Sequence, residues 1–159
     1  MSASEFQGCP GSVMMDLRDT DTATDDGPVA AAPSQLRQWP IQLHLVSPQA
    51  PYFQGADVLV AADCTAFAVG AFHNDYLKGK SLAIACPKLD QGQDVYLEKI
   101  KALAEDAKIN TLTVMIMQVP CCRGLAALTA EALSQSSRKV PVKVVVVGLQ
   151  GDILSEEWL

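Results

Sequence analysis

The stretch 57-DVLVAADC-64 decides the fold of this chain, because a continuous apolar run ends there in an acidic residue and a cysteine. The runs LAIA at 82–85 and VKVVVV at 142–147 have a similar apolar character. Such runs are typical of parallel strands that are buried on both faces. Between them, residues 94–108 repeat apolar side chains at helical spacing. Strands separated by helices predict an α/β fold with a mostly parallel sheet.

Outward from these runs, strands and helices are expected to alternate along the chain. The expected strands are 41–46, 57–62, 81–85, 112–119 and 142–147, and the expected helices are 66–77, 94–108 and 122–134. Together they predict a three-layer, Rossmann-like, mostly parallel sheet of about five strands with flanking helices. We expect a compact α/β domain over residues 39–159, preceded by an acidic N-terminal arm over residues 1–38 that carries Cys9.

Composition narrows the class of protein. The chain has 159 residues, a net charge of −6 and 49% hydrophobic residues, which suits one compact domain. The negative charge argues against binding to nucleic acid, since contacts with phosphates need a basic surface. No apolar run reaches the length of a membrane helix, and the first residues lack the features of a signal peptide. We therefore expect a cytoplasmic protein with no membrane or nucleic-acid partner.

The five cysteines, Cys9, Cys64, Cys86, Cys121 and Cys122, are the main candidates for chemistry. Four of them follow a strand-like run, and the carboxyl ends of parallel strands share one edge of the sheet, where ligands collect. We therefore expect these four thiols to converge. In a cytoplasmic chain, five cysteines indicate metal or redox chemistry rather than structural disulfides.

The spacing Cys9-x54-Cys64-x21-Cys86-x34-Cys121-Cys122 matches neither a zinc ribbon nor a bacterial ferredoxin. Local details nevertheless favour an iron–sulfur cluster. Prolines next to the cysteines stiffen the loops that present the thiolates, and Cys122 is expected at the start of a helix, where negative charge is stabilised. The alternative is that single cysteines such as Cys64 or Cys86 are small apolar core residues.

Other residues carry weaker signals. His44, His73 and Asp63 could contribute to a metal site, although His44 is more simply a hydrogen-bonded histidine. No G-x-G-x-x-G or Walker loop is present in the sequence, so nucleotide binding has little support. We expect the glycine-containing stretch 148–151 to be a turn.

Several segments resemble a family of small bacterial and archaeal iron–sulfur proteins, some of which carry a ferredoxin module before this domain. The matching segments are CPGS at 9–12, LRQWPIQLHLVSPQAPYFQGADVLVAADCTAFA at 36–68, FH at 72–73, ACPKLD at 85–90 and VPCCRGL at 119–125. The resemblance implies a cluster more firmly than a reaction. This chain departs from the pattern in lacking the ferredoxin module, in Val13 where Arg is expected, and in Arg123 where Gly is expected.

A looser similarity is to the cysteine-rich CCG domains of heterodisulfide reductases, which hold a noncubane [4Fe-4S] cluster. The spacing Cys86-x34-Cys121-Cys122 is similar to the first half of that motif, but the closing C-x-x-C is missing. Adjacent cysteines also ligate a [4Fe-4S] cluster in small subunits of respiratory complex I. The pair is therefore compatible with either form of cluster.

The sequence thus predicts an iron–sulfur protein, with a cluster of the [4Fe-4S] type, that acts in electron transfer or redox sensing. Cys64, Cys86, Cys121 and Cys122 are the main candidate ligands, and Cys9 is a further ligand or replaces one of them. A redox partner protein, either ferredoxin-like or an oxidoreductase, is expected, and homo-oligomerisation stays open. The alternatives are a zinc- or thiol-based module without iron, and a disulfide or thiol reductase with an unusual cluster. Whether the protein is an enzyme is left open.

Overall fold

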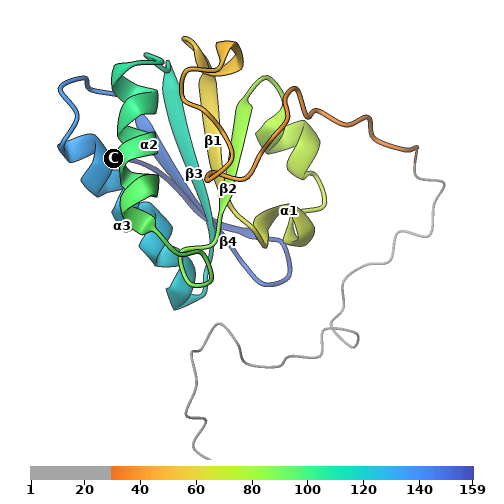
Figure 1. Cartoon of the computed structure of the whole chain (residues 1–159). Coiled ribbons are helices and arrows are strands. Elements are labelled where there is room, and N and C mark those ends of the chain that lie inside the picture. Colours follow the sequence, from red (N-terminus) through yellow and green to blue (C-terminus); the bar gives the residue numbers. More distant parts are fainter. Residues whose placement is uncertain (1–29) are drawn as a thin grey trace, which may run out of the picture.

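The computed structural model describes residues 30–159, so Cys9 and most of the expected N-terminal arm lie outside the described residues. The described part forms a five-stranded sheet in the order β2-β1-β3-β4-β5 (Figure 1). Its strands are β1 (Asp57–Ala62), β2 (Ser81–Ala85), β3 (Thr111–Met117), β4 (Val142–Val147) and β5 (Ile153–Trp158). The first four are parallel and β5 is antiparallel to β4. The predicted α/β fold with a mostly parallel sheet is confirmed.

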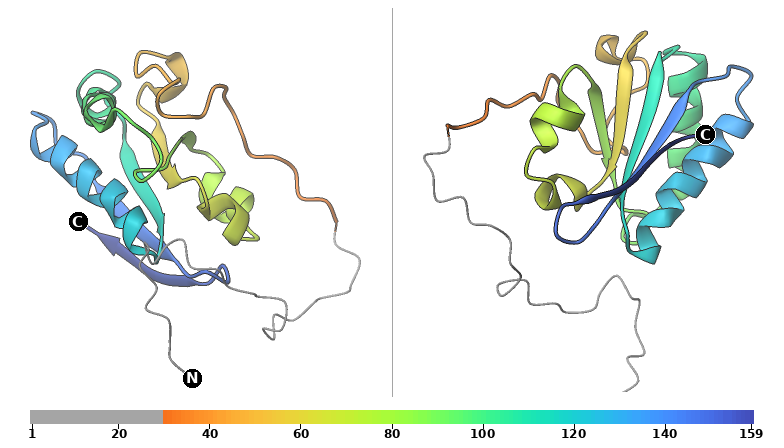
Figure 2. Two further views of the ribbon diagram at one scale, coloured as in Figure 1. Left: turned by 60° about the horizontal axis from the view of Figure 1, so that its bottom comes forward. Right: turned by 180° about the vertical axis from the view of Figure 1, so that it is seen from behind.

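Helices cover both faces of this sheet, which makes three layers (Figure 2). The helices α2 (Gln93–Glu105) and α3 (Pro120–Ser134) pack side by side on one face. The other face carries two short elements, α1 (Thr65–Ala68) and the π-helical η3 (Phe72–Leu77), while the single turn η2 (Pro51–Phe53) precedes β1. Among the helices of residues 30–159, none combines the length and the apolar character needed to cross a membrane.

The central strand β1 is apolar because both of its faces are covered. Val58, Leu59 and Val60 have no solvent exposure, in agreement with the burial inferred from the apolar run. The chain leaves β1 toward β2 on one side and leaves β3 toward β4 on the other. The carboxyl ends of β1 and β3 therefore form the topological switch point, where ligands bind in open α/β sheets.

The prediction of a strand at 41–46 is wrong. Only Gln42 makes a parallel bridge, to Ile84 on the outer edge of β2. The chain then turns, because the amides of Leu45 and Val46 donate to the carbonyl of Gln42 at 2.8 and 3.0 Å. The ammonium of Lys99 holds this turn by donating to the carbonyls of Leu43, His44 and Val46 at 3.0, 2.7 and 2.9 Å. Backbone groups that are used within the turn are not available to a ladder, and the apolar side chains of Leu43 and Val46 are buried in the core instead.

Two further elements differ from expectation. The helix predicted over 66–77 is interrupted, since α1 ends at Ala68 and a new turn starts at Phe72, with Gly70 between them. The fifth strand is β5 rather than the segment at 41–46. The stretch 148–151 is the expected turn, and it joins β4 to β5 through a hydrogen bond of 2.9 Å from Gly151 N to Gly148 O.

Candidate functional site

The structure places four cysteines on the rim formed by the carboxyl ends of the parallel strands. Cys64 lies two residues after β1, Cys86 directly follows β2, and Cys121 and Cys122 lie in the first turn of α3, after β3. Because the three strands are parallel, all four positions fall on one edge of the sheet, which includes the switch point. We refer to this set of four residues as the cysteine rim.

The loops of the cysteine rim pack closely on one another. A Cβ atom added at Gly124 in α3 would lie 3.4 Å from Cβ of Pro87, so the start of α3 sits directly against the loop after β2. The absence of a side chain at Gly124 therefore allows the pair Cys121–Cys122 to approach the loop that carries Cys86.

The thiols lie within electrostatic reach of one another. Burial raises the pKa of Cys64, and the neighbouring Cys86, Asp63 and Cys121 raise it further. The pKa of Cys122 is raised to about 11, mainly by burial. A backbone hydrogen bond with Met117 lowers this pKa, whereas the neighbouring Cys121 and Cys64 raise it. Thiols from three different strand ends thus interact. In the metal-free protein Cys64 and Cys122 are protonated at neutral pH, so a metal that binds them must displace their protons.

The four thiols differ in their access to solvent. Cys64 is exposed, Cys86 and Cys121 are half-buried, and Cys122 is buried. Cys122 follows Pro120, which occupies the first turn of α3, and its amide donates to the carbonyl of Val119 at 3.1 Å. The partial positive charge of this helix start favours thiolates bound there.

A hydrogen-bond network, which sequence reasoning missed, fixes the loop that carries Cys86. Asp90 Oδ2 accepts the amide of Cys86 at 2.8 Å, the Gln42 side-chain amide at 3.0 Å and the hydroxyl of Tyr96. The amide of Asp90 donates back to the carbonyl of Cys86 at 2.9 Å, and Gln42 also donates to the Tyr96 oxygen at 2.9 Å. The loop is therefore held in shape by side chains of the chain itself. The available signal was an aspartate four residues after the cysteine.

The other residues singled out by the sequence occupy different places. His44 Nε2 lies 2.6 Å from the carbonyl oxygen of Gln91, and its ring centre lies 4.1 Å from that of Tyr96. His44 therefore packs beside the hydrogen-bond network of Asp90. His73 Nδ1 accepts the amide of Gln35 at 3.0 Å, in η3. Neither histidine is among the groups that shift the pKa values of Cys64 and Cys122.

Asp63, which lies between β1 and Cys64, has a partly buried carboxyl group with a raised pKa. Its Oδ1 is buried and has no hydrogen-bond partner within the described residues. Burial and the carboxylate of Asp90 raise its pKa. Its position next to the cysteine rim makes it the acidic group closest in sequence to Cys64.

Four cysteine thiols form a donor set that either a zinc ion or an iron–sulfur cluster can take. Zinc needs four ligand atoms at about 2.0 to 2.3 Å from one centre. Over residues 30–159, no group of three or more His, Cys, Asp or Glu side chains is close enough to hold one metal ion.

Comparison with known proteins establishes the class of protein. The Rossmann-like domain model matches residues 50–159, and the chain belongs to that family. A protein of Archaeoglobus fulgidus, described only as uncharacterized, is 30% identical over 121 residues, which make up 75% of this chain and 83% of that protein. No solved structure gives a significant match. These findings support the fold and leave the resemblance to iron–sulfur proteins a prediction.

Proposed function

We propose that this protein binds an iron–sulfur cluster, of the [4Fe-4S] type, at the cysteine rim and acts in electron transfer or redox sensing. The ligands are drawn from Cys64, Cys86, Cys121 and Cys122, with Cys9 as a further ligand or as a replacement for one of these four. When bound, such a cluster supplies a one-electron redox centre. The chain's own residues hold it, shape the surrounding loops and set the local charge.

The observation that carries this proposal is the interaction of thiols from three separate strand ends at a switch point. The pKa of Cys64 responds to Cys86 and Cys121, and that of Cys122 responds to Cys121 and Cys64. Cysteines that served only as core residues would have no reason to gather where a Rossmann-like fold binds ligands. The gathering of soft sulfur donors favours iron–sulfur chemistry or another soft metal.

Two features of the rim would tune the bound group. The start of α3 directs partial positive charge at Cys121 and Cys122, which stabilises thiolates. Asp63 and Asp90 add negative charge beside Cys64 and Cys86. Net charge and hydrogen bonding near a cluster set its reduction potential, and added negative charge disfavours reduction. The start of α3 and the two aspartates therefore act in opposite directions on the reduction potential of the proposed centre.

Cys9 lies outside the described residues, but chain length does not prevent its participation. The segment between Cys9 and Ala30 can extend to roughly 70 Å. That is several times the radius of gyration of roughly 14 Å expected for a domain of this size. Cys9 can therefore reach any point of the domain surface, including the cysteine rim.

Anaerobic purification followed by single substitutions tests the proposal. The full chain should be brown, absorb near 400 nm and contain iron and sulfide. Cys64→Ser, Cys86→Ser and at least one of Cys121→Ser and Cys122→Ser should lose iron, because each removes a ligand. Met117→Leu is the matched control: it changes a buried sulfur residue at the end of β3, and a swap of this size is well tolerated.

The measurements are the iron and sulfide content of each protein and its electron paramagnetic resonance spectrum after reduction. Circular dichroism shows whether each variant folds. Folded cysteine variants that all keep full iron would refute the ligand assignment. A colourless wild-type protein with stoichiometric zinc would instead support the zinc-binding alternative. A colourless, metal-free protein with a reversible disulfide would support a thiol-based redox module.

A further inference from the structure

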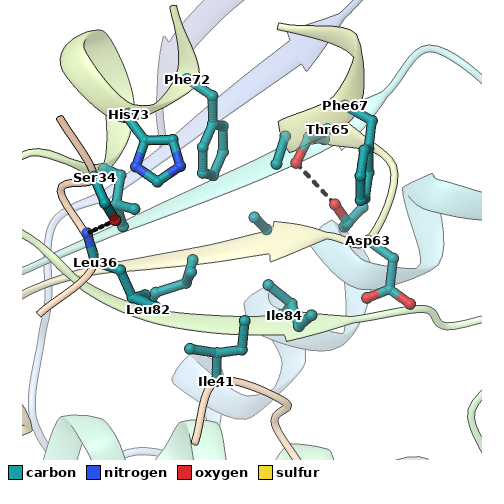
Figure 3. A pocket seen from close by; sticks show the side chains of 14 residues that line it. Ser34, Leu36, Ile41, Asp63, Thr65, Phe67, Phe72, His73, Leu82 and Ile84 are labelled. Atoms are coloured by element: carbon teal, nitrogen blue, oxygen red, sulfur yellow. Dashed lines mark hydrogen bonds between the residues drawn. The ribbon is translucent and has the colours of Figure 1, made fainter. Parts of the chain in front are cut away.

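A cavity of about 240 Å³ lies on the face of the sheet that carries α1 and η3, beside the cysteine rim (Figure 3). Its floor is formed by β1 and β2, including Leu82 and Ile84, and its other walls by Phe72 of η3 and by the incoming segment with Leu36. The cavity exists because α1 and η3 are too short to cover the sheet in the way that α2 and α3 cover the opposite face.

The walls of the cavity are almost entirely apolar, and no lysine or arginine lines it among the described residues. An anionic molecule would find no permanently charged cationic partner there. The volume exceeds the roughly 150 Å³ of an apolar protein cavity that accepts benzene. Phe67, at the cavity wall, has 93% of its surface exposed, so an occupant would also remove this ring from water.

Polar groups lie only at the ends of the cavity. His73 lies at one end, next to Ser34, and Asp63 lies near the other, beyond Ile84 (Figure 3). His73 Nδ1 accepts the amide of Gln35, so in the neutral ring Nε2 carries the proton and is a donor. An apolar cavity with a few polar groups at its ends is the usual form of a small-molecule site.

We propose that this cavity binds a small, uncharged and mainly apolar molecule of one to two rings in size. Asp63 and Thr65, which flank Cys64 in the chain, both line the cavity. A bound molecule therefore lies next to the cysteine rim. This site is additional to the proposed cluster, and it stands on cavity shape and lining whether or not iron binds.

The test is a titration of the anaerobically purified full chain, labelled at Ile, Leu and Val methyl groups, with benzyl alcohol as the probe. Methyl signals of residues that line the cavity, Leu36, Ile41, Leu77, Leu82 and Ile84, should shift saturably. For a probe this small we expect a dissociation constant on the order of 1 mM. Leu133 and Leu159, which lie together between α3 and β4 and do not line the cavity, should not shift.

Two variants and a second probe sharpen the test. Ala66 lines the cavity but is exposed, so Ala66→Phe should fill the cavity from its open side without disturbing the core and weaken binding at least tenfold. Ala127→Phe, at an exposed position of α3, is the matched control and should bind as the wild type does. Benzoate, similar in size but anionic, should bind at least tenfold more weakly.

Each contrary result overturns a defined part of the proposal. If the cavity methyl groups of the wild type do not respond, the cavity is closed in solution or filled by residues 1–29, and it is not a ligand site. Equal binding by Ala66→Phe would place the probe elsewhere. Equal binding of benzoate would refute the preference for uncharged molecules.

Discussion

Asp90 should be the residue that gives the Cys86 loop its shape, and Asp90→Ala tests this directly. The substitution removes three hydrogen bonds to one carboxylate oxygen, from the Cys86 amide, from Gln42 and from Tyr96. A hydrogen bond to a charged group contributes about 1.5 to 3 kcal/mol. The three bonds share one acceptor and Asp90 is only half-buried, so their contributions do not add fully. We expect a loss of about 2 to 3 kcal/mol in the free energy of unfolding.

The assay has two readouts on the metal-free protein. Urea unfolding gives the stability, and mass spectrometry of peptides gives the rate at which iodoacetamide alkylates Cys86. Asp90→Ala should lower the free energy of unfolding and raise the rate of alkylation of Cys86, because the loop opens. Asp90→Asn, which keeps an acceptor oxygen, should be milder. Asp94→Ala, an exposed aspartate in the first turn of α2, is the matched control and should cost less than about 1 kcal/mol. If Asp90→Ala were as stable as the control and Cys86 reacted no faster, the network would not hold the loop.

Two further predictions concern the edge formed by β4 and β5. Gly151→Ala should lower the free energy of unfolding, measured by urea titration, by at least about 2 kcal/mol, because φ is +90° and the new Cβ would lie 2.1 Å from the carbonyl oxygen of Ala68. The control is Gly70→Ala, where no atom lies within 4 Å of the new Cβ. Its free energy of unfolding should stay within about 0.5 kcal/mol of the wild type. Equal effects of the two substitutions would refute the packing argument. Lys143→Met should cost no more than about 1 kcal/mol at pH 7, since the 2.8 Å pair with Glu156 is partly exposed. The hydrogen bond with Lys143 lowers the pKa of Glu156 below its ordinary value of 4.5, so the stabilisation by this pair is present above pH 4.5 and is lost as the pH falls. If the variant and the wild type differed in free energy of unfolding by the same amount at pH 3 as at pH 7, this account would be contradicted.

The buried parallel strands could be predicted because their sequence is dictated by burial on both faces. Val58 to Val60 have no solvent exposure and must be apolar, so a single sequence reveals them. The run at 142–147 was also recognised as a strand, although it is buried only in part. The long helices α2 and α3 were found for a similar reason, through the spacing of their buried residues. Knowledge of parallel strands alone then placed four cysteines on one rim.

What the sequence could not reveal depends on contacts between distant residues. The segment at 41–46 has an apolar pattern that fits a strand, but Lys99, far along the chain, binds its carbonyls. The strand β5 was missed because ILSEEW is largely exposed and lacks the apolar alternation of a half-buried strand. The sequence around Asp90 gives no sign of its partners, and only its pairing with Gln42 and Tyr96 shows its structural role.

Each outer strand of the sheet, β2 and β5, has a feature that opposes pairing with a strand of a second copy. At β2, the Gln38 side chain occupies both backbone groups of Leu82, and the bridge from Gln42 covers Ile84. At β5, Glu156 and Glu157 would face their counterparts if two such strands met side by side, and like charges in that position repel. Extension of the sheet by a second copy through β2 or β5 is thereby opposed in the native state.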